Sequence, residues 1–259
     1  MALRLGLICA LVCLTHPLSA AVKLVVREGR PFVDGVFVNG HGPYRFLLDT
    51  GTNINLIEAR LAIKIGMDST FRDEVASSIG RTSLAGGDGN AVELGPVRAE
   101  RQRFQYSSLE AIHQVWPDVR GVLGQAFLRG FDYMIDLRNR RLEFGKQAVS
   151  GSRAEAMMHD GRQAVSTILG DLVLDSGASR LVLFGVVPNM RELSDMLTVA
   201  GTKAVGMVTS KLSIGTRNIW RGDAVAIPEK AEPGVAGLMP LSLFDAAYIS
   251  NSEGYVVLK

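Results

Sequence analysis

Hydrophobic and polar residues alternate along much of the chain, a pattern that predicts half-buried β-strands. Residues 33–38 alternate in this way, and after a turn at residues 39–42 a second apolar strand at residues 44–48 leads directly into Asp49-Thr50-Gly51. Two strands joined by a short glycine-containing turn predict a β-hairpin. The hairpin therefore ends in a polar loop that begins with a carboxylic acid.

The second half of the chain repeats this order. Residues 165–169, a turn at 170–171 and residues 172–174 lead into Asp175-Ser176-Gly177. Further along each half, a glycine-led apolar segment precedes a terminal hairpin; the two segments cover residues 121–128 and 237–244, and the two hairpins cover residues 132–144 and 247–258. The same elements in the same order predict two related lobes.

Helical patterns are few. Leu56–Ile65 has helical spacing and ends before Gly66, and Pro188–Ala200 begins with proline and ends before Gly201, so both are predicted to be helices. Residues 148–162 break any periodicity and predict a linker. We therefore expect an all-β, bilobal protein with β-barrel-like lobes at residues 21–147 and 163–259 and a few short helices.

Residues 1–20 are typical of a secretory signal peptide. Arg4 is followed by an apolar run of about ten residues and then by the small residues Ser19-Ala20-Ala21, whereas about 20 apolar residues are needed to span a bilayer as a helix. We expect cleavage after Ala20 or Ala21 and an exported product, periplasmic or secreted, without stable membrane insertion. The only two cysteines, Cys9 and Cys13, lie in this segment, and a mature chain without disulfides is more typical of bacteria.

The composition argues against several classes of function. The chain has 259 residues, of which 47% are hydrophobic and 21% charged, with a formal net charge of +2, so it is predicted to fold and not to bind nucleic acid. Once the signal peptide is removed, no cysteine remains, and the histidines form neither His-x-His nor His-Glu-x-x-His. These absences argue against a thiol nucleophile and a zinc hydrolase, and we expect no metal and no cofactor.

Asp49 and Asp175 are the candidate catalytic residues. Each directly follows three apolar strand residues, whose burial opposes the ionisation of a carboxylic acid. One Asp-Thr-Gly triplet is most often a simple turn, but two triplets in matching contexts favour a functional site. Brought together, the two carboxyls would share one proton, so that one acts as general base and the other as general acid in the hydrolysis of a peptide by water.

Residues 46–52 and 121–128 resemble the motifs of the retropepsin and pepsin superfamily of aspartic proteases, particularly its short bacterial members. This resemblance implies that both aspartates bind the attacking water and that residues 122–124 pass through a ψ-shaped loop behind them. It also implies supporting roles for the loop residues Thr50, Gly51, Thr52, Ser176 and Gly177. By the same resemblance, Gly86, Gly87, Asp88 and Gly89 are expected at the tip of a hairpin flap that closes over the substrate.

The second half departs from this pattern at two positions. Pro240 stands where the first half has Gly124, and Ala178 stands where it has Thr52, a hydroxyl that in the family donates to the catalytic carboxylate. We expect a monomeric aspartic endopeptidase that acts on a peptide or protein substrate. Two alternatives stay open: an inactive peptide-binding protein of the same fold, and a homodimeric enzyme with a degenerate second lobe.

Overall fold

The computed structural model describes residues 21–77, 80–185, 191–198, 201–227 and 233–259. Strands dominate this part of the chain, so the predicted all-β class is confirmed. The first half consists of β1 (Val22–Arg27), β2 (Arg30–Val38), β3 (His41–Leu48), β4 (Asn55–Glu58), α1 (Ala59–Lys64), β5 (Phe71–Ser77), β6 (Gly80–Leu94), β7 (Val97–Ser107), α2 (Glu110–His113), β8 (Val119–Leu123), α3 (Gln125–Leu128), β9 (Tyr133–Asp136) and β10 (Arg141–Phe144).

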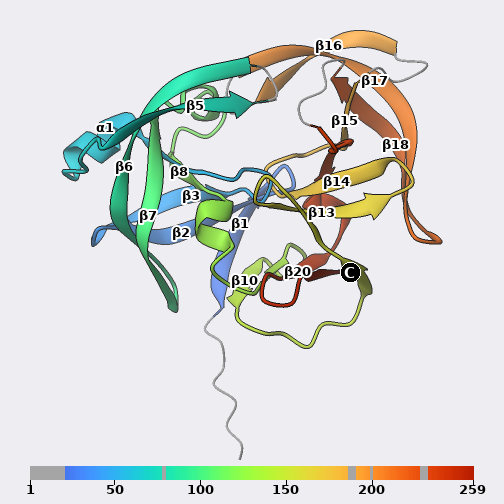
Figure 1. The fold of residues 1–259 in the computed structure, drawn as a ribbon, viewed down its shortest axis with the longest axis horizontal. Coiled ribbons are helices and arrows are strands. Elements are labelled where there is room, and N and C mark those ends of the chain that lie inside the picture. The colour runs from blue at the N-terminus through green and yellow to red at the C-terminus, as the bar shows by residue number, and fades with distance from the viewer. Residues whose placement is uncertain (1–20, 78–79, 186–190, 199–200, 228–232) are drawn as a thin grey trace, which may run out of the picture.

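The second half consists of β11 (Ser152–Glu155), β12 (Met157–His159), β13 (Arg162–Thr167), β14 (Gly170–Asp175), β15 (Val182–Phe184), β16 (Arg191–Thr198), β17 (Gly201–Ile214), β18 (Arg217–Ile227), β19 (Gly237–Pro240), the 3₁₀ helix η1 (Leu241–Leu243), β20 (Ala246–Ser250) and β21 (Tyr255–Leu258). The strands form two sheets: one contains β1–β11, β20 and β21, and the other contains β12–β19. In Figure 1, β2, β3 and β5–β8 lie on the left of the molecule, and β13, β14, β17 and β18 lie on the right.

Both lobes have the same central arrangement of strands. In the first lobe, β3 pairs in parallel with β8, and Leu48 lies opposite Leu123. In the second, β14 pairs in parallel with β19, and Asp175 lies opposite Pro240. Pro240 therefore occupies the threaded segment without disrupting it, and the short helix that follows is η1 in place of α3.

The terminal hairpins join the lobes. Strands β9 and β10 of the first lobe and β20 and β21 of the second lie in one continuous sheet, in which β9 pairs with β20. The predicted linker at 148–162 contains two strands: β11 pairs with β21 in this joining sheet, and β12 pairs with β13 in the second sheet. A hydrophobic core of buried residues runs through both halves, from Val22 to Leu258.

Both helix predictions need correction. Only Ala59–Lys64 of the first segment is helical; Asn55–Glu58 is strand β4, which pairs with β7 and β8. In the second segment, Arg191–Thr198 is strand β16, and residues 188–190 and 199–200 lie outside the described part of the chain. Pairing with neighbouring strands outweighs local helical spacing in both cases.

Two long hairpins, β5–β6 and β16–β17, rise from opposite lobes toward the same end of the molecule (Figure 1). Gly86 and Gly87 lie inside β6, where Gly86 pairs with Phe71 on one side and Gln105 on the other. The prediction that Gly86, Gly87, Asp88 and Gly89 form a hairpin tip is therefore wrong. Strands β5 and β6 are paired as far as Ser77 and Gly80, and residues 78–79 lie outside the described residues.

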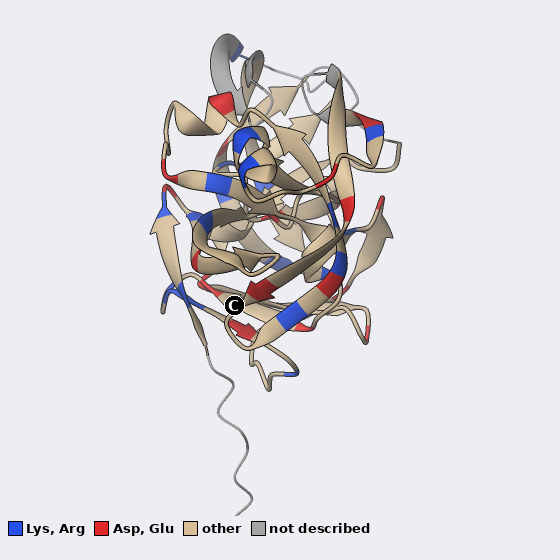
Figure 2. Cartoon of the chain, turned by 90° about the vertical axis from the view of Figure 1, so that its left-hand side faces the viewer, with Lys and Arg blue, Asp and Glu red and all other residues tan. Residues whose placement is uncertain are grey.

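Charged residues of both signs are spread along the strands and turns drawn in Figure 2. Several form surface ion pairs, such as Arg27 with Asp118 at 2.8 Å. Across the described ranges, no helix has the length and apolar character needed to cross a membrane.

Candidate active site

Asp49 and Asp175 meet at the interface between the lobes, each at the end of a buried strand. Both side chains are buried, with 8% and 7% of their surface exposed. A Cβ atom added to Gly51 would lie 2.3 Å from Cγ of Asp175, and one added to Gly177 would lie 2.6 Å from Cγ of Asp49. Each loop thus packs directly against the opposite carboxyl, which leaves room only for glycine.

The hydroxyls of Thr50 and Ser176 link the two loops reciprocally. Thr50 Oγ1 donates to the Leu174 carbonyl at 2.8 Å and accepts the Ser176 backbone N–H at 3.0 Å. Ser176 Oγ donates to the Leu48 carbonyl at 2.6 Å and accepts the Thr50 N–H at 3.0 Å. Four buried hydrogen bonds therefore fix the relative positions of the strands that carry the two aspartates.

Backbone donors differ between the two carboxyls. Asp49 Oδ1 accepts the Gly51 N–H at 2.9 Å. Asp175 Oδ1 accepts the Ala178 N–H at 2.9 Å, and the Gly177 N–H also stabilises this carboxylate. Ala178, which has no hydroxyl, therefore contributes its backbone instead.

Burial and mutual repulsion control the ionisation of this pair. Burial, as the larger cause, and the charge of Asp175 raise the pKa of Asp49 well above its usual range. Burial also raises the pKa of Asp175, but the backbone donors Ala178 and Gly177 oppose that rise. Two backbone donors stabilise the ionised form of Asp175 and one stabilises that of Asp49, so the pair is favoured with one shared proton and a single negative charge.

Residues beyond the two triplets hold the first loop in place. The buried Gln125 donates through Nε2 to the Thr50 carbonyl at 3.1 Å, and its backbone N–H donates to the Thr52 carbonyl at 2.8 Å. Asn55 Oδ1 accepts the Gly124 N–H at 3.1 Å. Thr52 thus acts in this network through its carbonyl, and the threaded segment 122–124 supports the catalytic loop from behind.

Two buried or half-buried arginines beside the dyad were not singled out from the sequence. Arg30 Nε donates to the Gly177 carbonyl at 2.6 Å, and Arg162 Nη1 donates to the Gly51 carbonyl at 3.3 Å. The sequence does contain a pattern that points to these arginines. An acidic residue, a glycine and an arginine occur in this order at the start of each hairpin, as Glu28-Gly29-Arg30 and as Asp160-Gly161-Arg162.

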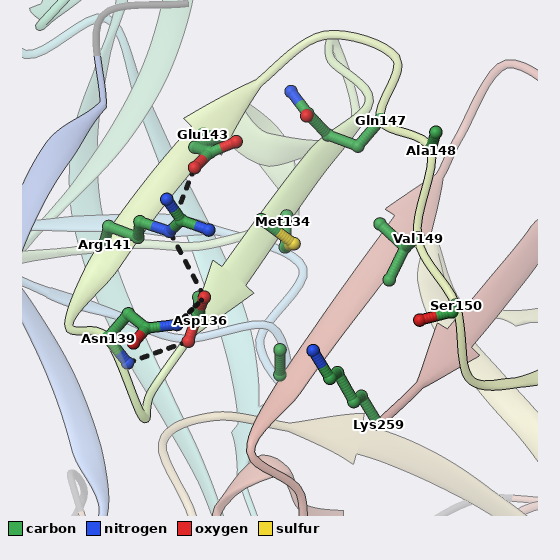
Figure 3. Close-up of a pocket in the computed structure, with 11 residues that line it drawn as sticks. Met134, Asp136, Asn139, Arg141, Glu143, Gln147, Ala148, Val149, Ser150 and Lys259 are labelled. Atoms are coloured by element: carbon green, nitrogen blue, oxygen red, sulfur yellow. Dashed lines mark hydrogen bonds and ion pairs between the residues drawn. The ribbon is translucent and has the colours of Figure 1, made fainter.

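A separate hollow lies at the sheet that joins the lobes (Figure 3). Its lining contains neither aspartate of the dyad and no residue of the catalytic loops. Asp136 there is bound by Asn139 and Arg141, and Arg141 also lies 3.0 Å from Glu143. Arg141 thus bridges two acidic side chains, and we interpret the hollow as the site of a structural ion cluster.

Within the described ranges, no group of three or more histidine, cysteine, aspartate or glutamate residues could hold a metal ion. The arrangement at the lobe interface can hold one water between two carboxyls, of which one is ionised and the other protonated. Such a pair can withdraw a proton from water and donate another to the substrate.

Comparison with known proteins gives a family match for part of the first half of the chain. Residues 35–127 match the model of a family described as Aspartyl protease, a range that includes Asp49-Thr50-Gly51 and the threaded segment but not Asp175. The resemblance to the retropepsin-like aspartic proteases is thereby confirmed. Solved structures that match include a retropepsin-like aspartic protease from Rickettsia conorii, with a TM-score of 0.37 and 19% identity, over 48% of this chain and 87% of that one. No curated protein matches.

Proposed function

We propose that this protein is an aspartic endopeptidase that cleaves peptide or protein substrates with a water molecule held between Asp49 and Asp175. The observation that carries the proposal is the meeting of these two buried carboxyls across the lobe interface, each in contact with the glycine of the opposite loop. The match to the Aspartyl protease family over residues 35–127 supports the same chemistry.

In the proposed reaction, the Asp175 carboxylate accepts a proton from the water as its oxygen attacks the peptide carbonyl carbon. Asp49 donates its proton to the carbonyl oxygen, which gives a neutral tetrahedral diol. Collapse of the diol breaks the C–N bond: the Asp175 proton passes to the leaving nitrogen, and one diol hydroxyl returns its proton to the Asp49 carboxylate as the C=O bond re-forms. The hydrogen bonds of Thr50 and Ser176 keep both carboxyls in place through these transfers.

The decisive experiment is cleavage of a diverse peptide library by the purified mature protein at several pH values, with and without a statine-type inhibitor. We expect cleavage in mild acid, inhibition by the statine compound, and a loss of at least about a hundredfold in kcat for Asp49→Asn and for Asp175→Asn. Both variants keep the volume of the side chain, so their thermal unfolding controls for loss of fold.

The two alternatives give different outcomes in this experiment. If the parent protein binds peptides but cleaves none, the peptide-binding alternative is correct. If Asp175→Asn keeps full activity while Asp49→Asn loses it, the first lobe works as a homodimer. Reciprocal contact of the two loops within one chain favours the single-chain enzyme.

We also propose that the protein is exported after cleavage at Ala20 or Ala21 and acts in the periplasm or outside the cell. The short apolar run and the small residues before Val22 support this proposal. Mass spectrometry of the periplasmic or secreted product tests it, and a product that keeps residues 1–20 in a membrane fraction would contradict it.

A further inference from the structure

Arg30 and Arg162 form equivalent contacts with the two catalytic loops, each from the opposite lobe. Arg30, in the first lobe, donates to the Gly177 carbonyl at 2.6 Å and through Nη2 to Ser179 Oγ at 3.0 Å. Arg162, in the second lobe, donates to the Gly51 carbonyl at 3.3 Å. Like the hydrogen bonds of Thr50 and Ser176, these contacts run from each lobe to the other.

The turns that present the two arginines have the same conformation. Glu28 and Gly29 join β1 to β2 with φ values of 51° and 78°, and Asp160 and Gly161 join β12 to β13 with φ values of 49° and 75°. Two consecutive positive φ values are those of the type I′ turn, which matches the twist of a two-residue hairpin. The arginine is the next residue in each case and begins the following strand.

Further contacts hold each turn against the opposite lobe. Asn53 Nδ2, in the first catalytic loop region, donates to Asp160 Oδ2 at 2.6 Å. A Cβ atom added to Gly29 would lie 2.8 Å from Cβ of Ser242, so the first turn packs tightly against the second lobe. Both arginines are therefore placed by rigid hairpins and not by long loops.

Both arginine side chains are largely withdrawn from solvent beside the dyad. Arg162 is buried, with 8% of its surface exposed, and the side chain of Arg30 is 15% exposed and lies over the Trp116 ring at 5.2 Å. The charge of Arg162 lowers the pKa of both Asp49 and Asp175, against the larger effect of burial. Glu28, 3.2 Å from Arg30, and Asp160 are the acidic groups of the two turns.

We propose that Arg30 and Arg162 are positioning residues of the dyad. Each hairpin turn places an arginine across the lobe interface, where its guanidinium group binds the glycine carbonyl of the opposite catalytic loop. The two fixed positive charges hold the carboxyls together in their singly ionised form. This inference rests on the proposed function of Asp49 and Asp175. In a water-poor site, a charge that is already in place stabilises an anion more strongly than solvent can.

The experiment separates charge from hydrogen bonding at position 162. Arg162→Lys keeps the charge, whereas Arg162→Gln keeps a donor and removes the charge; Arg30→Lys and Arg30→Gln do the same at position 30. Arg141→Gln, in the ion cluster of Figure 3, is the matched control. Carbon NMR of the labelled aspartate carboxyls across pH reports the titration of the dyad, with the signals assigned from the Asp→Asn variants, and kcat/KM is measured over the same pH range.

We expect both Gln variants to shift the dyad titration and the acidic limb of kcat/KM to higher pH, with a roughly tenfold or larger loss of kcat/KM in acid. The Lys variants should lie close to the parent, and Arg141→Gln should match it. Folding is checked by thermal unfolding.

Two results would overturn the proposal. One is a folded Gln variant whose dyad titrates as in the parent. The other is loss of fold in both the Lys and the Gln variant at one position, which would make that arginine a purely structural residue. The NMR titration needs no activity, so a parent that cleaves nothing refutes the proposed function while the role of the arginines is still decided.

Discussion

Asp49 and Asp175 are equivalent in sequence but unequal in their surroundings. Asp175 accepts N–H donors from Ala178 and Gly177, and Asp49 accepts one from Gly51. The sequence suggested that a missing hydroxyl at position 178 would deprive Asp175 of a donor. Backbone geometry, which the side-chain type does not specify, provides that donor instead, and it makes Asp175 the better-stabilised carboxylate.

Replacing Asp49 by Asn should stabilise the protein at neutral pH. Burial raises the pKa of Asp49, so between the ordinary carboxyl pKa and the raised value the folded state holds a proton that the unfolded state has lost. The free energy of unfolding of the parent therefore falls as pH rises through this window, by about 1.4 kcal/mol for every unit by which the pKa is raised.

Urea unfolding of the parent and Asp49→Asn at intervals between pH 4 and 8 would measure this difference. The variant should gain stability relative to the parent as pH rises and keep a constant advantage above the window. A difference that does not change with pH, or that has the opposite sign, would show that Asp49 is not held protonated by the fold.

Thr50→Val should destabilise the lobe interface. The substitution keeps the shape of the side chain but leaves the Leu174 carbonyl and the Ser176 N–H without their buried partner, at a cost of about 1–3 kcal/mol. Thr167→Val is the matched control, because its hydroxyl makes the same two kinds of bond in an exposed turn, to Gly170 and Leu169. Equal losses of unfolding free energy in the two variants would contradict a special role for Thr50.

Some residues of the site follow from the sequence pattern, and others do not. Asp49 and Asp175 were predicted because a repeated triplet after an apolar strand conflicts with simple burial. Arg30 and Arg162 were missed, because an arginine at the start of a strand is ordinarily solvated. Only the crossing of each turn into the other lobe makes these arginines part of the site, and that crossing depends on how the lobes pack.

At the scale of elements, strand pairing explains the errors in prediction. The spacing of Leu56–Ile65 suits a helix, but Asn55–Glu58 completes the sheet between β7 and β8. The glycines at 86 and 87 suggested a hairpin tip, whereas they lie mid-strand where neighbours approach closely. An added Cβ at Gly86 would meet the Phe104 carbonyl at 2.4 Å, so close packing and not chain reversal requires these glycines.

Gly86→Ala therefore tests the corrected position of this segment. We expect a loss of about 1–3 kcal/mol in unfolding free energy, because the Phe104 carbonyl belongs to a paired backbone and cannot move away freely. Gly130→Ala is the control, since its added Cβ would find only the Phe127 carbonyl, at 3.5 Å. If Gly86→Ala were as stable as Gly130→Ala, residue 86 would lie in an open turn and not within β6.

In the whole molecule, each lobe contributes one carboxyl to the dyad, and a shared sheet joins the lobes. The repeat of hairpin, triplet and glycine-led segment predicted two related lobes, and the strand pairings of β3 with β8 and of β14 with β19 show that shared plan. The pairing of β9 with β20, which fixes the lobes side by side, connects strands more than a hundred residues apart. No local pattern specifies such a contact.

A chain that assembles both halves of the dyad should act as a monomer. The reciprocal bonds of Thr50 and Ser176, and the contacts of Arg30 and Arg162, already provide from one chain what two identical lobes would otherwise provide by association. Specific activity should therefore stay constant over a thousandfold dilution, because dilution dissociates a dimer but not two lobes joined covalently. Sedimentation velocity at the same concentrations supplies the independent measure of mass. Activity that falls with dilution, in step with a shift from dimer to monomer, would show that the second lobe does not complete the site and that the homodimeric alternative is correct.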